Sequence, residues 1–327
     1  MSALREIYIR HFRGTPVGDA VRSLWYACRR VFFSVTNWRI NPRRVLVWDW
    51  RKRFPSAWEF QYRAVYVARY YWPRLRIGIS WLLDSRETSN FTYDLTPRNM
   101  EHLAQLLAVV ARQPTADVSR YLKELSDDQA LKETVAARVK FRGAHGGYDP
   151  VARFGRRIGW YAIVRATKPK LVVETGVEKG LGAMVLCAAL MRNAQEGFQG
   201  RYLGTDIDPA AGGLFCEPYN AMGKILYGDS IKSLSGLDAT IDLFINDSDH
   251  SAEYEGREYR VIAPKMSRQG IIVGDNAHVT DELLKFSRET DRQFLFFREE
   301  SANHWYLGAG IGLSFRRAAV QNERSLG

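Results

Sequence analysis

The sequence predicts an α/β protein with a doubly wound, mostly parallel sheet, and two observations lead to this prediction. Beyond residue 150, short apolar segments alternate with amphipathic stretches of helical periodicity. Strands that alternate with helices pair in parallel through right-handed crossovers, and the helices then cover both faces of the sheet. The last two apolar segments lack a convincing helix between them, so we expect an antiparallel hairpin at one edge. The seven predicted strands are residues 170–175, 201–207, 224–229, 241–247, 270–275, 293–297 and 310–315.

The 327-residue chain is longer than one average domain, and its composition predicts three parts. Residues 1–85 are basic and rich in aromatic side chains, residues 86–140 have mainly helical patterns, and residues 141–327 hold the α/β domain. In the helical region, Thr96 and Pro97 are typical of a helix N-cap and first helical residue. We therefore expect the α/β domain to follow a mainly helical N-terminal region.

The basic segment, residues 1–85, differs in composition from the rest of the chain. It holds 15 Arg and one Lys against five acidic residues, so it accounts for the whole formal net charge of +11, and it holds seven of the nine Trp. Residues 17–32 predict an amphipathic helix with a basic polar side. Three roles suit such a segment: a packing domain or homo-oligomerisation arm, RNA binding, and binding to an anionic membrane surface. We favour the first, with aromatic side chains inside and Arg outside.

The bulk composition excludes several classes of protein. A hydrophobic content of 46% with 25% charged residues is ordinary for a soluble globular protein. The three cysteines lie far apart without a CxxC pair, which argues against a zinc site and a disulfide framework. No stretch has the length of a signal peptide's apolar core near the N-terminus, and the longest apolar run, residues 181–191, is too short to cross a bilayer. We expect a cytoplasmic protein.

The carboxyl ends of the first three predicted strands carry a candidate ligand site. In open parallel sheets, ligands bind outside these ends, where the strand order reverses. The first strand leads into Glu174, Gly176 and Gly180, and such glycines let the backbone turn tightly and approach a ligand. The second strand ends at Asp206, which can accept both ribose hydroxyls of a nucleoside, and the third ends at Asp229, which can lie beside an adenine ring. The spacing is neither G-x-G-x-x-G nor a P-loop, so a dinucleotide or nucleoside triphosphate site is disfavoured.

The next two predicted strands end in clusters of polar side chains. Asp247, Asp249 and His250 follow the fourth strand, and Asp275 and Asn276 close the fifth. Because neighbouring parallel strands end at the same edge of the sheet, we expect Asp247 to lie near Asp275 and Asn276. Two carboxylates and an amide suit Mg²⁺ or another hard divalent cation. Asp249 is as well explained as the N-cap of the following helix.

Taken together, the strand-end motifs resemble those of the class I S-adenosylmethionine (SAM)-dependent methyltransferases, over roughly residues 140–316. The resemblance implies a Rossmann-like fold in which the loop after the first strand wraps the methionine part of SAM. It also implies that the acid at the end of the second strand binds the ribose. The SAM-binding residues that it implies are Glu174, Gly176, Gly180, Asp206 and Asp229.

Within that class, the pattern is similar to the metal-dependent O-methyltransferases. The catechol and caffeoyl-CoA enzymes have an Asp, then Asp-Asn, at the positions of Asp247 and of Asp275 with Asn276. Catechol enzymes place a Lys base three residues after the first Asp, whereas this chain has His250, as the macrolide-sugar O-methyltransferases do. The resemblance implies that Asp247, Asp275 and Asn276 bind Mg²⁺. It also implies that His250, acting with Asp247, deprotonates the metal-bound acceptor.

These observations predict a SAM- and Mg²⁺-dependent O-methyltransferase that acts on a hydroxyl of a small molecule, a natural product or a sugar, rather than on nucleic acid. A neutral His with a pKa of about 6.5 is mismatched by about nine units, on the order of 12 kcal/mol, with an alcohol of pKa near 15.7, so metal and base should act together. Three alternatives stay open: a methyltransferase of RNA or another macromolecule that uses the basic segment, a non-catalytic SAM-binding subunit, and a nucleotide-sugar or NAD enzyme.

Overall fold

The structure is a computed structural model that describes residues 55–84, 92–142, 151–302 and 304–317. The helix expected at residues 17–32 lies outside these ranges. The chain divides into two compact units, Met1–Arg76 and Ile77–Gly327. The sheet and the candidate site belong to the second unit.

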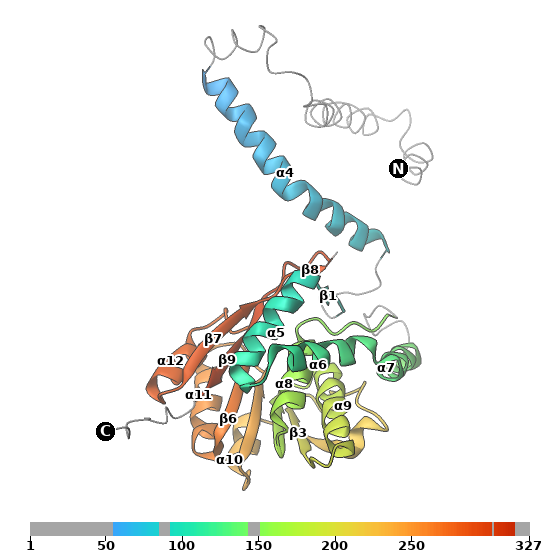
Figure 1. Cartoon of the computed structure of the whole chain (residues 1–327), viewed down its shortest axis with the longest axis vertical. Helices are drawn as coiled ribbons and strands as arrows, with labels where there is room; N and C mark the ends of the chain where they lie inside the picture. Colours follow the sequence, from blue (N-terminus) through green and yellow to red (C-terminus); the bar gives the residue numbers. More distant parts are fainter. Residues whose placement is uncertain (1–54, 85–91, 143–150, 303, 318–327) are drawn as a thin grey trace, which may run out of the picture. The chain divides into compact units, whose positions relative to one another are not determined.

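A seven-stranded sheet, in the order β4-β3-β2-β5-β6-β9-β7, forms the centre of the second unit (Figure 1). The strands from β2 to β6 run parallel, whereas β9 is antiparallel to both β6 and β7. The strand order reverses between β2 and β5, and the last two predicted strands pair as an antiparallel hairpin at one edge. The doubly wound fold is therefore confirmed. The strands are β2 (Leu171–Thr175), β3 (Arg201–Asp206), β4 (Gly223–Tyr227), β5 (Ile241–Asn246), β6 (Met266–Asp275), β7 (Gln293–Arg298) and β9 (Gly310–Phe315).

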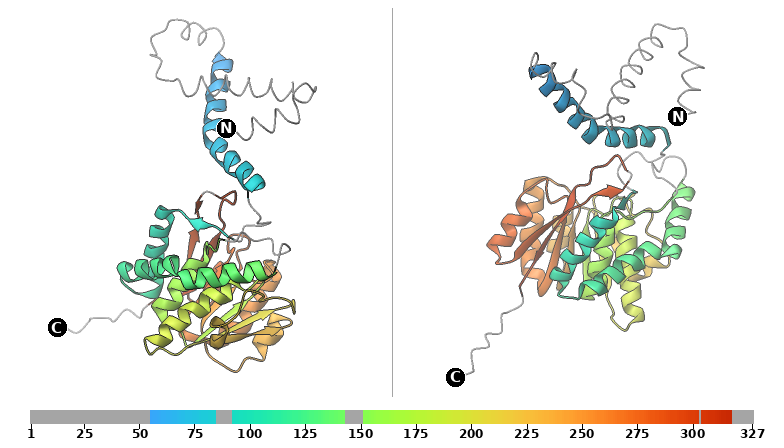
Figure 2. Two further views of the ribbon diagram at one scale, coloured as in Figure 1. Left: turned by 90° about the vertical axis from the view of Figure 1, so that its right-hand side faces the viewer. Right: turned by 45° about the horizontal axis from the view of Figure 1, so that its top comes forward.

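Helices cover both faces of this sheet, and two apolar cores fill the space between (Figure 2). Alternate strand residues supply the two cores: Val172 joins the first and Val173 the second, because successive side chains of a strand point to opposite faces. The first core is completed by α5 (Pro97–Ala111), α6 (Thr115–Asp127), α7 (Gln129–Arg142), α8 (Arg157–Thr167) and α9 (Leu181–Gln195). The second is completed by α10 (Ser230–Ser235), α11 (Ala252–Ile262) and α12 (Glu282–Glu289).

The predicted helical region therefore packs on the same core as α8 and α9, while its boundaries at residues 85 and 140 stay predictions. Its first helix begins as expected, because Pro97 is the first helical residue and the Thr96 side chain accepts a hydrogen bond from the Asn99 amide. The short strand β1 (Asp94–Leu95) precedes this helix and pairs with β8 (Ser301–Ala302), far along the chain, in a two-stranded sheet. Two short 3-10 helices, η2 (Tyr219–Met222) and η3 (Ala263–Lys265), complete the described elements.

The aromatic stretch after Pro55 forms one long helix, α4 (Pro55–Asp84), which the sequence analysis did not predict. Its large aromatic side chains, among them Phe60, Tyr66 and Tyr70, are exposed. Within the single chain these aromatic side chains do not lie inside a packing domain, while their burial in a homo-oligomer stays a prediction. Within the described ranges, no helix combines the length and apolar character that a bilayer span requires.

Candidate functional site

A cavity of about 720 Å³ opens at the carboxyl ends of β2, β3, β4 and β5. Its volume lies within the range of small-molecule and cofactor sites. Three of the residues predicted to bind SAM, Gly176, Asp206 and Asp229, line it. Asp247 lines the same cavity, whereas His250, Asp275 and Asn276 do not, so the two predicted halves of the site share this cavity only at Asp247.

Gly176 brings the two halves into direct contact. Its φ of +80° lies in the left-handed region that glycine adopts most readily. A Cβ atom at this position would lie 1.9 Å from the main-chain oxygen of Asp247, so only glycine fits beneath that segment. Gly180 also has a positive φ, +94°, and precedes the first turn of α9. The glycines of the loop thus serve the turn and the close passage of two chain segments.

Backbone amides hold the two carboxylates of the cofactor half. The Glu178 and Asp208 amides donate to the two carboxylate oxygens of Asp206, over 2.7 and 2.9 Å. Asp229 caps α10 by accepting from the Lys232 amide over 2.8 Å, and it also accepts from the Tyr254 hydroxyl over 3.2 Å. Each acid is therefore fixed in place by local hydrogen bonds while it faces the cavity.

Glu174, the third acid predicted to bind the cofactor, is buried beneath the loop and is not among the residues that line the cavity. Its carboxylate accepts a hydrogen bond from the Tyr202 hydroxyl. Burial raises the pKa of Glu174 to about 8, although the bond from Tyr202 and the charge of Arg157 act in the opposite direction. Gly180 does not line the cavity either.

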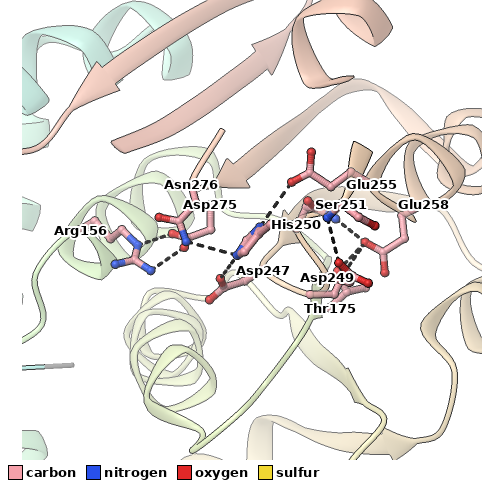
Figure 3. Close-up of polar contacts among 12 residues, drawn as sticks. Arg156, Thr175, Asp247, Asp249, His250, Ser251, Glu255, Glu258, Asp275 and Asn276 are labelled. Atoms are coloured by element: carbon pink, nitrogen blue, oxygen red, sulfur yellow. Dashed lines mark hydrogen bonds and ion pairs between the residues drawn. The ribbon is translucent and has the colours of Figure 1, made fainter. Parts of the chain in front are cut away.

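The ends of β5 and β6 bring the predicted acid-and-histidine cluster together (Figure 3). Asp247, His250 and Asp275 each offer a potential ligand atom, and these atoms lie within 4.8 Å of one another. The His250 Nε2 atom lies 3.7 Å from an Asp247 carboxylate oxygen, and the Asn276 side-chain amide donates to the same nitrogen over 3.2 Å. Four of the five residues named by the strand-end prediction, all except Asp249, therefore meet at one place.

The other ring nitrogen of His250 faces a carboxylate that the sequence analysis missed. Nδ1 lies 3.4 Å from Glu255, which is buried at the start of α11 and also accepts from the Thr280 hydroxyl. The hydrogen bond to Glu255 raises the pKa of His250 above its ordinary value, against the opposing effect of burial. A carboxylate on Nδ1 orients the ring and leaves Nε2 facing Asp247 and Asn276, as in other base–carboxylate pairs.

Asp275 has a second unpredicted partner, Arg156, whose guanidinium donates to both of its carboxylate oxygens in a fully buried ion pair. Arg156 also donates to the Tyr93 hydroxyl over 3.1 Å, and Tyr93 in turn donates to Glu299 over 2.6 Å. Burial alone would raise the pKa of Asp275, but Arg156 lowers it below the ordinary value. Asp275 is therefore charged in this setting.

Residues 173–277, which span the strands β2 to β6 and the whole strand-end cluster, match the family described as a methyltransferase domain. The chain carries a methyltransferase domain. This match confirms the resemblance to the class I SAM-dependent methyltransferases, and it supports a SAM-dependent methyltransferase enzyme. None of the curated proteins matches the chain.

Several solved structures are similar to this methyltransferase at low identity. A methyltransferase of Podospora anserina, bound to S-adenosylhomocysteine (SAH), is 18% identical over 62% of this chain and 96% of that one, with a TM-score of 0.43. A putative caffeoyl-CoA O-methyltransferase of Staphylococcus aureus is 12% identical over 60% and 99%, with a TM-score of 0.44. An O-methyltransferase of Bacillus cereus in complex with SAH is 14% identical over 59% and 96%, with a TM-score of 0.42.

The donor set of the methyltransferase fits a hard divalent cation. Asp247 offers a carboxylate oxygen beside His250 and Asp275, while Asp275 shares its oxygens with Arg156 and the Asn276 side-chain nitrogen faces His250. Burial, followed by the charge of Asp275, raises the pKa of Asp247 well above its ordinary value. A buried carboxylate beside another carboxylate requires a cation to stay ionised.

Glu258 is a further buried acid of the methyltransferase that the sequence analysis missed. It accepts hydrogen bonds from Thr175 over 3.1 Å and from Ser248 over 2.8 Å, and also from Ser230 and Asn246. These donors lie at the ends of β2 and β5 and on the cavity wall, so Glu258 ties them together. The sequence does hold a signal for these two buried acids. Glu255 and Glu258 lie on the same buried side of α11 as Tyr259 and Ile262, where apolar side chains are usual.

The expectation that Asp249 caps the following helix is corrected in one detail. The N-cap of α11 is Ser251, whose hydroxyl accepts from the Tyr254 amide. Asp249 instead accepts a hydrogen bond from the Ser251 amide over 2.8 Å and shapes the turn before the cap. Its side chain thus stabilises the chain reversal between β5 and α11.

Proposed function

We propose that this methyltransferase transfers the methyl group of SAM to a hydroxyl of a small molecule, a natural product or a sugar. The single observation that carries the proposal is the position of His250. Its Nδ1 faces Glu255, and its Nε2 faces Asp247 and Asn276 at the strand tips beside the cavity. A base oriented in this way suits the removal of a proton from an oxygen acceptor.

The cofactor is assigned to the cavity half formed by β2, β3 and β4. Gly176 would let the loop pass close to the ligand, Asp206 would accept the ribose hydroxyls, and Asp229 would lie beside the adenine ring; all three line the cavity. Glu174 supports the loop from beneath. Holding the methyl donor in this half and the acceptor beside His250 supplies the proximity that an in-line displacement needs.

His250 takes the proton of the acceptor hydroxyl on Nε2, while Glu255 keeps the ring oriented and stabilises the imidazolium that forms. The methyl group moves from the sulfonium sulfur of SAM to the acceptor oxygen, so the S–CH3 bond breaks, SAM becomes SAH and the acceptor becomes a methyl ether. Asp247, Asp275 and Asn276 would hold Mg²⁺, which, when bound, supplies positive charge that stabilises negative charge developing on the acceptor oxygen. Arg156 keeps Asp275 ionised and in place.

The test is methyl transfer from isotopically labelled SAM to a panel of hydroxyl-bearing small molecules, with EDTA and with added Mg²⁺. We expect turnover to fall at least about 100-fold in EDTA and in Asp247→Asn, and to return with Mg²⁺ only in the wild type. Asp281→Asn, at an exposed site before α12, is the matched control and should keep its activity. Full turnover in EDTA would remove Mg²⁺ from the proposal, and failure to transfer methyl to any hydroxyl would overturn it.

A further inference from the structure

Helix α4 has no part in the proposed reaction, yet it exposes much more apolar surface than a soluble helix usually does. Phe60 is 71% exposed and Leu82 is 72% exposed, and their neighbours along the helix are similarly accessible. Contiguous exposed apolar surface of this kind marks an interaction site.

The helix is amphipathic in a particular arrangement. At roughly 100° per residue, an apolar face covers a little under half of the circumference. The Arg residues fall at the two borders of that face, Arg63 and Arg74 on one side and Arg69 and Arg76 on the other. The acid Glu59 falls on the opposite side, together with Tyr62, Tyr66 and Tyr70. The apolar face comprises Phe60, Val67, Tyr71, Leu75, Ile79 and Leu82.

This distribution fits the interface of a lipid bilayer. Long Arg side chains at the borders can extend their guanidinium groups to lipid phosphates while their stems lie along the apolar face. Tyr and Trp side chains, abundant in α4, are enriched at the level of the lipid headgroups. Glu59 points away from the surface that the apolar face would enter. The partner must therefore be both apolar and negatively charged.

We propose that α4 lies in the plane of an anionic bilayer surface, with its apolar face in the boundary between headgroups and acyl chains. The charge agrees with this partner, because the helix holds four Arg against two acids, and residues 1–85 together have a net charge of +11. The phosphates of RNA could bind the Arg side chains, but RNA would leave the apolar face exposed to water. A second copy of the chain would bring Arg-bordered faces of like charge together.

The experiment is vesicle flotation of the full chain with large unilamellar vesicles of phosphatidylcholine and phosphatidylglycerol, 3:1, and of phosphatidylcholine alone. We expect at least about tenfold tighter binding to the anionic vesicles, weakening as salt is added. Leu75→Glu, on the apolar face and 54% exposed, should lower binding about tenfold or more. Tyr66→Glu introduces the same charge on the opposite side, at a residue that is 62% exposed, and should bind like the wild type apart from a small charge effect.

Both variants change exposed residues, and unchanged SAH binding and melting temperature would show that each is folded. Equal binding to both kinds of vesicle, or equal loss in both variants, would overturn the proposal. It would also be overturned if the chain failed to float and instead formed a dimer that Leu75→Glu dissociates, or bound RNA in a salt-dependent way. Flotation does not depend on methyl transfer, so its result is separate from that of the turnover assay.

Discussion

The two halves of the strand-tip site satisfy their acids in different ways. In the cofactor half, Asp206 and Asp229 accept hydrogen bonds from backbone amides, two of them only two or three residues away and the third from Glu178, 28 residues earlier. In the acceptor half, Asp275 pairs with Arg156, which lies 119 residues earlier in the chain. Hydrogen bonds to local amides keep an acid in position while leaving it close to water, whereas a buried ion pair depends on distant parts of the fold. Substitutions should therefore cost more in the acceptor half.

The largest effect should come from His250→Gln. The amide side chain keeps polarity but cannot accept a proton at neutral pH, so we expect kcat to fall by about 10² to 10⁴. Calorimetric titration with SAH should give an unchanged affinity, since the cofactor half is untouched. His278→Gln, in the exposed loop after β6, is the control and should retain turnover. Wild-type turnover in His250→Gln would assign the base to another residue.

Arg156→Met should have the next largest effect, on stability. It leaves the buried Asp275 without its partner, which typically costs about 3–5 kcal/mol of unfolding free energy. Arg153→Met removes a largely exposed pair with Asp94 and should cost less than about 1 kcal/mol. Urea denaturation at neutral pH measures both. If the two variants lost similar amounts of unfolding free energy, the buried pair of Arg156 and Asp275 would contribute no more to stability than the exposed pair does.

Glu174→Gln tests the one buried acid of the cofactor half through its pH dependence. Because its pKa is about 8 in the folded protein against an ordinary 4.5, the unfolded chain releases this proton first. The stabilisation that Glu174 gives to the folded chain through its raised pKa is complete below pH 4.5 and is lost as the pH rises towards 8. The unfolding free energy of the wild type should therefore fall by about 3 kcal/mol relative to Glu174→Gln between pH 5 and pH 8.

The matched control for that comparison is Glu133→Gln, at an exposed position of α7. Its difference from the wild type should be constant over the same pH interval, as followed by urea denaturation at each pH. A constant difference for Glu174→Gln as well would show that its carboxyl titrates alike in the folded and unfolded chains.

The smallest effect should come from Asp206→Asn. The amide oxygen still accepts one backbone hydrogen bond, but the charge and the second acceptor are lost, so SAH should bind about tenfold more weakly. Calorimetric titration measures this affinity, and the stability should change little. A loss of stability comparable to that of Arg156→Met would contradict the contrast drawn between the two halves.

The same contrast separates what the sequence predicts from what it does not. The sheet, its edge hairpin, the cap at Thr96 and the meeting of Asp247 with Asp275 follow from periodicity and from the rule that parallel strands end at one edge. The roles of Arg156 and Glu255 as partners could not be predicted in this way. The local sequence does not distinguish a buried charged residue from an exposed one, because its partner lies elsewhere in the chain. Helix α4 was missed for another reason: its Tyr and Trp content and the internal Pro73 disfavour a helix by local preference.

The passage of the Asp247 carbonyl over Gly176 has a consequence for the binding of the two substrates. The loop that faces the cofactor cannot shift without displacing the segment that leads to His250, since no space remains between them. Occupancy of the cofactor cavity should therefore change the affinity for the acceptor, and by thermodynamic reciprocity the acceptor should change the affinity for the cofactor by the same factor. The two substrates of this methyltransferase are then linked through a single main-chain contact.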